Sequence, residues 1–243
     1  MAKMLILDIE TNSLDIKKAE IIEFGFILTD NFNIIKSGSF LIKCENTIPD
    51  DIEALLTISN NFLNSYGCEK KEAYNKIAKL IDESDFVVVH NGFKFDIPIL
   101  ENQINLDLFK GKTIIDTMKH LPKDFYSKCE NRKLKFLCIE QGIYLSQAHR
   151  AMLDVTMLYC LLKKFSELDL STIVENALKI SCTYKIEVSF NDKELAKKIG
   201  GTWNSECSRW EIELYEDDYV ELVKKIKSDI QMSSKLSLKK VSL

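Results

Sequence analysis

Residues 4–11 have the sequence Met-Leu-Ile-Leu-Asp-Ile-Glu-Thr, an apolar run that predicts a buried β-strand with two acidic side chains. Side chains alternate between the two faces of a strand, so Asp8 and Glu10 point the same way. Two neighbouring carboxylates in a buried strand are costly unless a cation lies between them. This stretch alone leaves two interpretations open: a solvent-facing strand end or a metal-bound pair.

The composition bounds the class of protein. The chain has 243 residues, 46% hydrophobic and 29% charged, which fits one ordinary domain plus a smaller second one. No apolar run is long enough to cross a membrane, and the first residues lack the order of a signal peptide. The seven cysteines form no CxxC pair, so we expect reduced thiols and a cytoplasmic protein. The net charge of −4 does not exclude a nucleic-acid partner, because bound divalent cations reverse the local sign.

Hydrophobic periodicity and turn signals predict a sheet interleaved with helices after the opening strand. The wholly apolar residues 86–89, which follow a helical pattern, are typical of a central parallel strand. The short polar turns between the first three strands favour an antiparallel meander. The predicted elements are strands over 20–28, 34–43, 86–89 and 112–116, and helices over 69–82, 97–104, 133–142 and 148–167.

Two further acids stand in apolar surroundings. Asp96 lies at the start of the helix expected over 97–104, directly after the central strand. Asp154 lies inside the long apolar helix, where a carboxylate without a partner is rare and costly. With Asp8 and Glu10 they make four carboxylates, hard oxygen ligands of the kind that suit Mg²⁺ or Mn²⁺. Two such ions can stabilise the attacking and leaving oxygens of a phosphoryl transfer.

Three segments resemble the motifs of the DEDDh 3′–5′ exonucleases, the family of the proofreading subunit of bacterial DNA polymerase III, oligoribonuclease and ribonuclease T. They are Asp8-Ile9-Glu10-Thr11, the run from His90 through Asp96 to Leu100, and His149-Arg150-Ala151-Met152-Leu153-Asp154, which has the form H-x-A-x-x-D. The resemblance spans roughly residues 3–167. It implies an α/β, RNase H-like fold: a mixed five-stranded sheet, the first three strands antiparallel, with helices on both faces.

The resemblance also implies an activity, the release of nucleoside 5′-monophosphates from the 3′ end of DNA or RNA. Asp8, Glu10, Asp96 and Asp154 would hold two Mg²⁺ ions, for which Mn²⁺ can substitute. His149 would act as the general base, a role suited to imidazole. The expected partner is a nucleic acid with a free 3′ end, single-stranded rather than duplex; a DNA polymerase or a second copy of the chain would be its protein partner, and no membrane is expected.

By the same resemblance, other residues would contact the substrate. Thr11 and Asn12 would meet the terminal 3′-hydroxyl, and apolar side chains would line a pocket for the base. The expected substrate contacts are Thr11, Asn12, Leu14, Asn91 and Phe95, with Leu55 and Leu56 beside the base. The family often carries His-Gly near Leu56-Thr57, and this sequence lacks that pair.

Three residues near these motifs have structural interpretations. His90 is expected to orient the end of its strand rather than to bind metal, Asp116 to be structural, and His120 to lie at the surface. Two other functions remain open: a non-catalytic nucleic-acid- or polymerase-binding module on the same fold, and an endonuclease. The complete set of four carboxylates with His149 favours the exonuclease.

After the exonuclease domain (1–168) the pattern changes. We expect a linker helix over 169–182, a small βαβα module of α+β class over 183–227, and a disordered tail over 228–243. The segment from Asp192 to Trp210 resembles a small uncharacterised domain attached to DNA-processing and mobile-element proteins.

The module suggests a hypothesis about nucleic-acid contacts. Lys193, Lys197 and Arg209 would lie near phosphate and Trp203 would stack on a base. The alternative is that Trp203 and Trp210 form the core of the small module.

Overall fold

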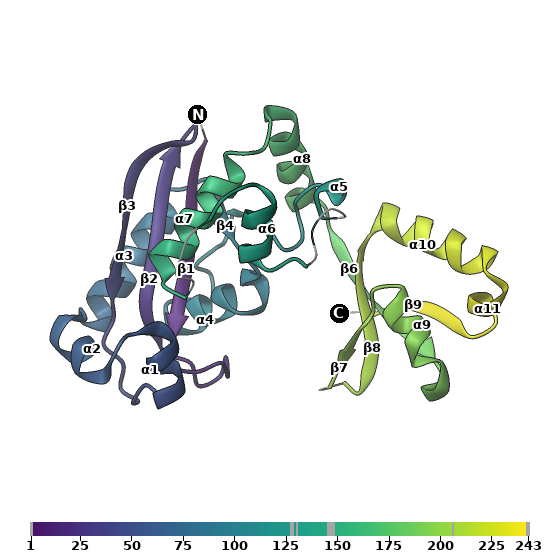
Figure 1. Cartoon of the computed structure of the whole chain (residues 1–243), viewed down its shortest axis with the longest axis horizontal. Helices are drawn as coiled ribbons and strands as arrows, with labels where there is room; N and C mark the ends of the chain where they lie inside the picture. Colours follow the sequence, from purple (N-terminus) through teal and green to yellow (C-terminus); the bar gives the residue numbers. More distant parts are fainter. Residues whose placement is uncertain (1, 127–128, 130, 145–148, 206, 242–243) are drawn as a thin grey trace. The chain divides into compact units, whose positions relative to one another are not determined.

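The structure, a computed structural model, describes residues 2–126, 129, 131–144, 149–205 and 207–241. The chain divides into two compact units, Met1–Leu178 and Lys179–Leu243, each built on its own sheet (Figure 1). Within the described ranges, no helix is both long enough and apolar enough to cross a membrane.

The first unit contains a five-stranded sheet in the order β3-β2-β1-β4-β5. The first three strands are antiparallel, whereas β4 joins β1 and β5 joins β4 in parallel. This confirms the predicted mixed sheet with an antiparallel meander. The strands are β1 (Lys3–Thr11), β2 (Ile21–Asp30), β3 (Asn33–Leu41), β4 (Phe86–Val89) and β5 (Thr113–Asp116).

Helices cover both faces of this sheet. One core cluster joins it to α3 and α4, and the other joins it to α6, α7 and α8 (Figure 1). The helices are α1 (Asp50–Leu56), α2 (Asn60–Tyr66), α3 (Lys70–Asp82), α4 (Asp96–Gln103), α5 (Lys123–Tyr126), α6 (Leu134–Glu140), α7 (Ala151–Leu162) and α8 (Glu167–Leu178), with a 3₁₀ turn η1 (Gly92–Lys94). The sequence patterns did not predict α1, α2 or α5.

The long helix expected over 148–167 is shorter than predicted. Ala148 lies outside the described residues, α7 begins at Ala151 and it ends at Leu162. A new helix starts because Ser166 and Asp169 cap it reciprocally: the Ser166 hydroxyl accepts from Asp169 N, and the Asp169 carboxylate accepts from Ser166 N. This second helix, α8, covers only the part of the expected linker up to Leu178, whereas Ser181 and Cys182 begin a strand of the second unit. Ile173 is buried in the first unit's core, so α8 belongs to that unit.

Alternation along β1 divides its side chains between the two cores. Leu5, Leu7 and Ile9 pack in the cluster beneath α3 and α4, and Ile6 packs in the cluster beneath α7. Asp8 and Glu10 continue the Ile6 row. The face of β1 that is apolar beneath α7 therefore turns acidic at its carboxyl end.

The second unit is a four-stranded antiparallel sheet in the order β7-β8-β6-β9. Its core includes Tyr184, Ile186, Ala196 and Ile212. The elements are β6 (Ser181–Val188), η2 (Phe190–Asp192), α9 (Lys193–Lys198), β7 (Thr202–Asn204), β8 (Arg209–Tyr215), α10 (Glu216–Ser228), α11 (Ile230–Ser233) and β9 (Leu236–Lys240).

The prediction of a disordered tail over 228–243 is wrong for its described part. Strand β9 pairs antiparallel with β6, and Met232 and Leu236 are buried in the core of this unit. Pairing explains the difference, because β6 offers an open edge whose backbone groups need partners. A segment rich in Ser and Lys becomes a strand there although its own composition favours disorder. Residues 242–243 lie outside the described residues.

Candidate metal centre

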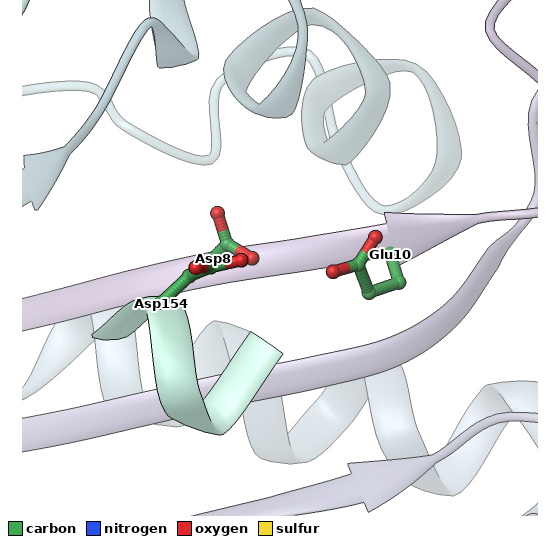
Figure 2. Close-up of side chains that lie close together, drawn as sticks. All are labelled: Asp8, Glu10 and Asp154. Atoms are coloured by element: carbon green, nitrogen blue, oxygen red, sulfur yellow. The ribbon is translucent and has the colours of Figure 1, made fainter. Parts of the chain in front are cut away.

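The opening strand and α7 bring three carboxylates together. Asp8 and Glu10 project from β1, and Asp154 projects from the first turn of α7 toward them (Figure 2). One oxygen of each lies within 4.8 Å of the others, a spacing that could hold a metal ion. The strand order allows this, because β4 pairs with β1 only as far as Ile6 and leaves the end of β1 open.

The three carboxylates disfavour one another's charged form. Burial and then the charges of Asp96, Glu10 and Asp154 raise the pKa of Asp8 well above its ordinary value. Burial, followed by Asp154 and Glu23, raises the pKa of Glu10 to about 8. Burial also raises the pKa of Asp154. Such a set is stable in its ionised form only beside positive charge, so its chemistry fits a divalent cation bound by oxygen ligands.

The fourth predicted carboxylate, Asp96, lies beside the cluster. It is the first residue of α4, and its Oδ1 accepts a hydrogen bond from Ile9 N at 3.2 Å, between the two acids of β1. Burial raises the pKa of Asp96 to about 7, although backbone hydrogen bonds from Ile9 and Asp96 oppose the shift. Asp96 is not one of the three residues that meet the 4.8 Å spacing.

A cavity of about 490 Å³ opens over this cluster. It brings together most of the residues that the sequence nominated for catalysis, metal binding or substrate contact. Those that line it are Asp8, Glu10, Leu14, Asn91, Phe95, Asp96, His149 and Asp154. Two lysines that the sequence analysis did not single out, Lys94 and Lys133, also line it.

His149 lies at the exposed rim of the cavity, just before α7. Its backbone is left-handed, with φ of 70°, and its N–H donates to Asp154 Oδ2 at 3.3 Å. The histidine of the third motif is thus tied through its backbone to the acid of the same motif. Its side chain is exposed.

Thr11 and Asn12 do not line the cavity. The Thr11 hydroxyl donates to Ser13 O at 2.8 Å. Asn12 is buried, and both ends of its amide are bonded to Glu20: Nδ2 donates to the Glu20 carboxylate and Oδ1 accepts from Glu20 N. The structure therefore uses the Asn12 side chain to shape the end of β1.

The leucines expected near the base separate in the structure. Leu14 is 84% exposed at the cavity. Leu55 is exposed, but it does not line the cavity, and Leu56 is buried in a different cluster with Ile22 and Ile58. Leu14 and Phe95 are the apolar side chains of the expected set that can meet a base here.

The second motif is held by Asp116 at the end of β5. Its carboxylate accepts from Asn91 N at 2.8 Å, Met118 N at 2.9 Å and Phe93 N at 3.3 Å. Asp116 therefore has the predicted structural role. His90 Nδ1 lies 2.8 Å from Thr117 Oγ1, consistent with orienting the strand end.

The prediction that His120 lies at the surface is wrong. Its side chain is buried, its Nδ1 accepts from Asp116 N at 3.0 Å, and its ring meets Phe93 edge-on. No motif surrounds His120. A turn closed by a hydrogen bond from His120 N to Asp116 O brings its ring against Asp116 and Phe93.

Sequence reasoning missed Glu23 on β2. This acid is 1% exposed, faces Glu10 across the β1–β2 ladder and pairs with Arg150. One signal was present: Glu23 interrupts an otherwise apolar strand, as Asp8 and Glu10 do. Its partner Arg150 stood unassigned inside the third motif.

Two of the residues nominated in the second unit, Trp203 and Arg209, lie on opposite faces of its sheet. In the ladder between β7 and β8, Trp203 is the register partner of Trp210, and Asn204 is the register partner of Arg209. Neighbouring positions of a strand face opposite sides of the sheet, so Arg209 points to the opposite face from Trp203. Arg209 and Lys197 are in ion pairs with Glu211 and Glu194. The indoles of Trp203 and Trp210 pack edge to face, and Trp203 remains 53% exposed. A single stacking and phosphate surface formed by Lys193, Lys197, Trp203 and Arg209 would need Trp203 and Arg209 on one face, and the register separates them.

Comparison with known families supports the motif assignment. The model of the RNase T family, described as exonuclease, matches residues 5–162. The protein named 3′-5′ exonuclease DinG from Staphylococcus aureus is 26% identical over 182 residues, which cover 71% of this chain and 20% of that protein. The PolC-type DNA polymerase III of Mycoplasma genitalium is 31% identical over 119 residues, which cover 48% of this chain and 8% of that protein. The chain thus spans a small part of the length of these curated relatives.

A solved structure shares the fold. Exonuclease I of E. coli, in a zinc ion bound form complexed with single-stranded DNA, aligns with a TM-score of 0.58 at 19% identity. The alignment covers 67% of this chain and 40% of that one. At this identity the likeness establishes the fold of the exonuclease neighbours, the RNase H-like arrangement expected from the motifs.

Proposed function

Since the chain belongs to the RNase T exonuclease family, we propose that it is a two-metal-dependent 3′–5′ exonuclease that releases nucleoside 5′-monophosphates. The observation that carries the proposal is the cluster of Asp8, Glu10 and Asp154, with one oxygen of each within 4.8 Å of the others. Buried carboxylates at this spacing serve no structural purpose that neutral side chains would not serve at lower cost.

We assign the cofactor to Mg²⁺, with Mn²⁺ as a substitute. Asp8, Glu10 and Asp154 would hold it, and Asp96 would complete the set. When bound, divalent cations supply the positive charge that offsets these carboxylates and stabilises the oxygens of a transferring phosphoryl group. Oxygen-only ligands suit these hard cations better than they suit zinc.

The chain's own residues would position the substrate and handle the proton. His149, exposed at the rim, would take a proton from the attacking water. Phe95 and Leu14 would pack against the terminal base without selecting its identity, and Asn91 would contact the terminal nucleotide. Lys94 and Lys133 would contact phosphates, because both are exposed and have no ion-pair partner among the described residues.

We propose single-stranded DNA as the substrate to test first, and a DNA polymerase as the protein partner to test first. Two similar proteins support these choices: exonuclease I of E. coli was solved with single-stranded DNA, and one relative is a DNA polymerase. A cytoplasmic location is also part of the proposal, and the free thiols of the chain are compatible with it.

The test is an assay on 5′-labelled oligonucleotides with Mg²⁺ or Mn²⁺. Single-stranded DNA, duplex DNA, RNA and dinucleotides should be compared, with Asp154→Asn and a chelator as controls. Stepwise shortening from the 3′ end is expected, and both controls should abolish it. Internal cuts would identify an endonuclease instead, and binding without shortening would identify a non-catalytic module on this fold.

A further inference from the structure

Glu23 and Arg150 form a partly buried, two-pronged ion pair next to the candidate metal centre. Arg150 Nε donates to Glu23 Oε2 and Arg150 Nη2 donates to Glu23 Oε1, each at 3.0 Å. Ala151 N also donates to Glu23 Oε2, at 3.3 Å. The Glu23 side chain is 1% exposed. One carboxylate of β2 thus holds both the residue before α7 and the first residue of α7.

The anchored residue lies between the two functional residues of the third motif. Arg150 O accepts the backbone N–H of Asp154 at 3.1 Å, which forms the first turn of α7. His149, on the other side of Arg150, donates its own N–H to the Asp154 carboxylate. A shift of Arg150 would therefore move both His149 and Asp154 relative to β1.

The cost of this arrangement points to a role. Glu23 faces Glu10 across the strand pair, so the fold buries a further negative charge beside the carboxylate cluster. A neutral side chain would avoid that repulsion, and neither a buried nor an exposed ion pair adds much net stability. The pair instead fixes the orientation of Arg150 on β2, because the guanidinium fork and the carboxylate fit in one planar geometry.

We propose that Glu23 and Arg150 are positioning residues that fix His149 and Asp154 over Asp8 and Glu10. This inference rests on the proposed metal-dependent nuclease function. Neither residue lines the cavity over the carboxylates, and the pair acts by locking the start of α7 onto β2.

The test uses the full chain and two single variants. Arg150→Lys keeps the charge but removes the fork, and Glu23→Gln keeps the shape but removes the charge. The matched control is Tyr159→Phe, which removes the hydrogen bond from Tyr159 Oη to Phe32 O and so loosens the other end of α7. Two quantities are measured well below the unfolding temperature: Mn²⁺ binding by calorimetry, and kcat and KM on a single-stranded oligonucleotide at saturating metal.

Each single variant should lose about 10–100-fold in Mn²⁺ affinity or in kcat, the range typical of groups that orient metal ligands. The Glu23→Gln/Arg150→Lys double variant should be no worse than the poorer single variant, since the two residues act as one unit. Tyr159→Phe should stay within about twofold of the wild-type chain in both measurements, because it leaves the first turn of α7 anchored.

Unchanged Mn²⁺ affinity and kcat in Arg150→Lys would overturn the inference, and so would equal losses in Tyr159→Phe. If Glu23→Gln does not fold, Arg150→Lys decides alone. Failure of the proposed function gives a different result: the wild-type chain would not shorten oligonucleotides, whereas Mn²⁺ binding would still report on the pair.

Discussion

A Cβ atom on Gly25 would lie 2.5 Å from the carbonyl carbon of Ala151, so β2 and the start of α7 meet backbone to backbone. Gly25 is also the register partner of Asp8. The helix that carries Asp154 therefore crosses the sheet at the strand position beside Asp8, and only a residue without a side chain permits that approach.

Substituting Gly25 by alanine should push α7 away from β2. The added methyl would meet backbone atoms of Ala151 and Met152, which cannot move without the helix. We expect a loss of about 3 kcal/mol in the free energy of unfolding and, because Asp154 moves with the helix, roughly a 100-fold loss of nuclease activity. Urea unfolding and the oligonucleotide assay measure these effects.

The matched control for this substitution is Gly38→Ala on β3. A Cβ there would meet the Phe26 ring at 3.7 Å, an ordinary van der Waals contact. Gly38→Ala should change stability and activity little. Wild-type activity in Gly25→Ala would show that the close approach does not set the position of Asp154.

The carboxylate cluster predicts how stability depends on pH when no metal is present. The raised pKa values of Glu10, about 8, and Asp96, about 7, mean that the folded state holds protons that the unfolded state has released. The stabilisation of the folded state by these bound protons is fully present below the ordinary carboxyl pKa, and it is lost as pH rises to about 8. Thermal unfolding with chelator should therefore give a falling Tm over this range.

Adding Mg²⁺ or Mn²⁺ should reverse this fall in Tm, because the metal binds the folded state. In Asp8→Asn the Tm with chelator should be higher than in the wild-type chain at about pH 8, and the metal should raise it less. Activity in this variant should be lost. An Asp8→Asn protein that gains as much Tm from metal as the wild-type chain would contradict the assignment of Asp8 as a ligand.

The contribution of Glu20 to stability should depend on pH in the opposite direction. Partial burial alone would raise its pKa, but hydrogen bonds from Lys70 and from the backbone of Glu45 and Asn46 lower the pKa of Glu20 to about 2. Its contribution is full above the ordinary glutamate pKa and is lost as pH falls toward 2.

Replacing Glu20 by glutamine should cost about 2 kcal/mol at neutral pH, a value reduced from the full shift because water screens the pair. Urea midpoints across the acid range should show the difference between wild-type and variant chains shrinking as pH falls. A difference in urea midpoint that stays constant with pH would mean that the charge of Glu20 does not stabilise its contacts with Glu45 and Asn46.

The two cavity lysines should control the salt dependence of substrate binding. Lys94→Gln and Lys133→Gln should each raise KM for a single-stranded oligonucleotide and reduce the slope of log KM against log salt by about 0.7, the value for one phosphate contact on a single strand. Hydrolysis of the p-nitrophenyl ester of thymidine 5′-monophosphate, which has no second phosphate, should change little.

Lys76→Gln serves as the control for these variants. Lys76 is on α3 and pairs with Glu72, away from the lining of the cavity. An unchanged salt slope in the two cavity variants, or the same change in Lys76→Gln, would exclude a specific phosphate contact at Lys94 and Lys133.

The local sequence was enough to predict the order and type of the five strands of the first sheet and of helices α3, α4, α6 and α7. Alternation from residue 4 to residue 10 set Asp8 and Glu10 on one face, and the apolar run at 86–89 indicated a central parallel strand. The three motifs pointed to the carboxylates and His149, because each of these residues lies inside one short motif. Periodicity and motifs are short-range properties, and these features depend on nothing more distant.

The tertiary structure alone decided what distant residues do to one another. Glu23 and Arg150 are 127 positions apart, and nothing local to either residue predicts their pairing. Gly25 has its role because α7 crosses β2 there, and β9 is a strand because β6 offers it an edge. The sequence by itself identified the carboxylates and His149 that line the site. Packing and register, which join residues far apart in the chain, decided how those groups are held.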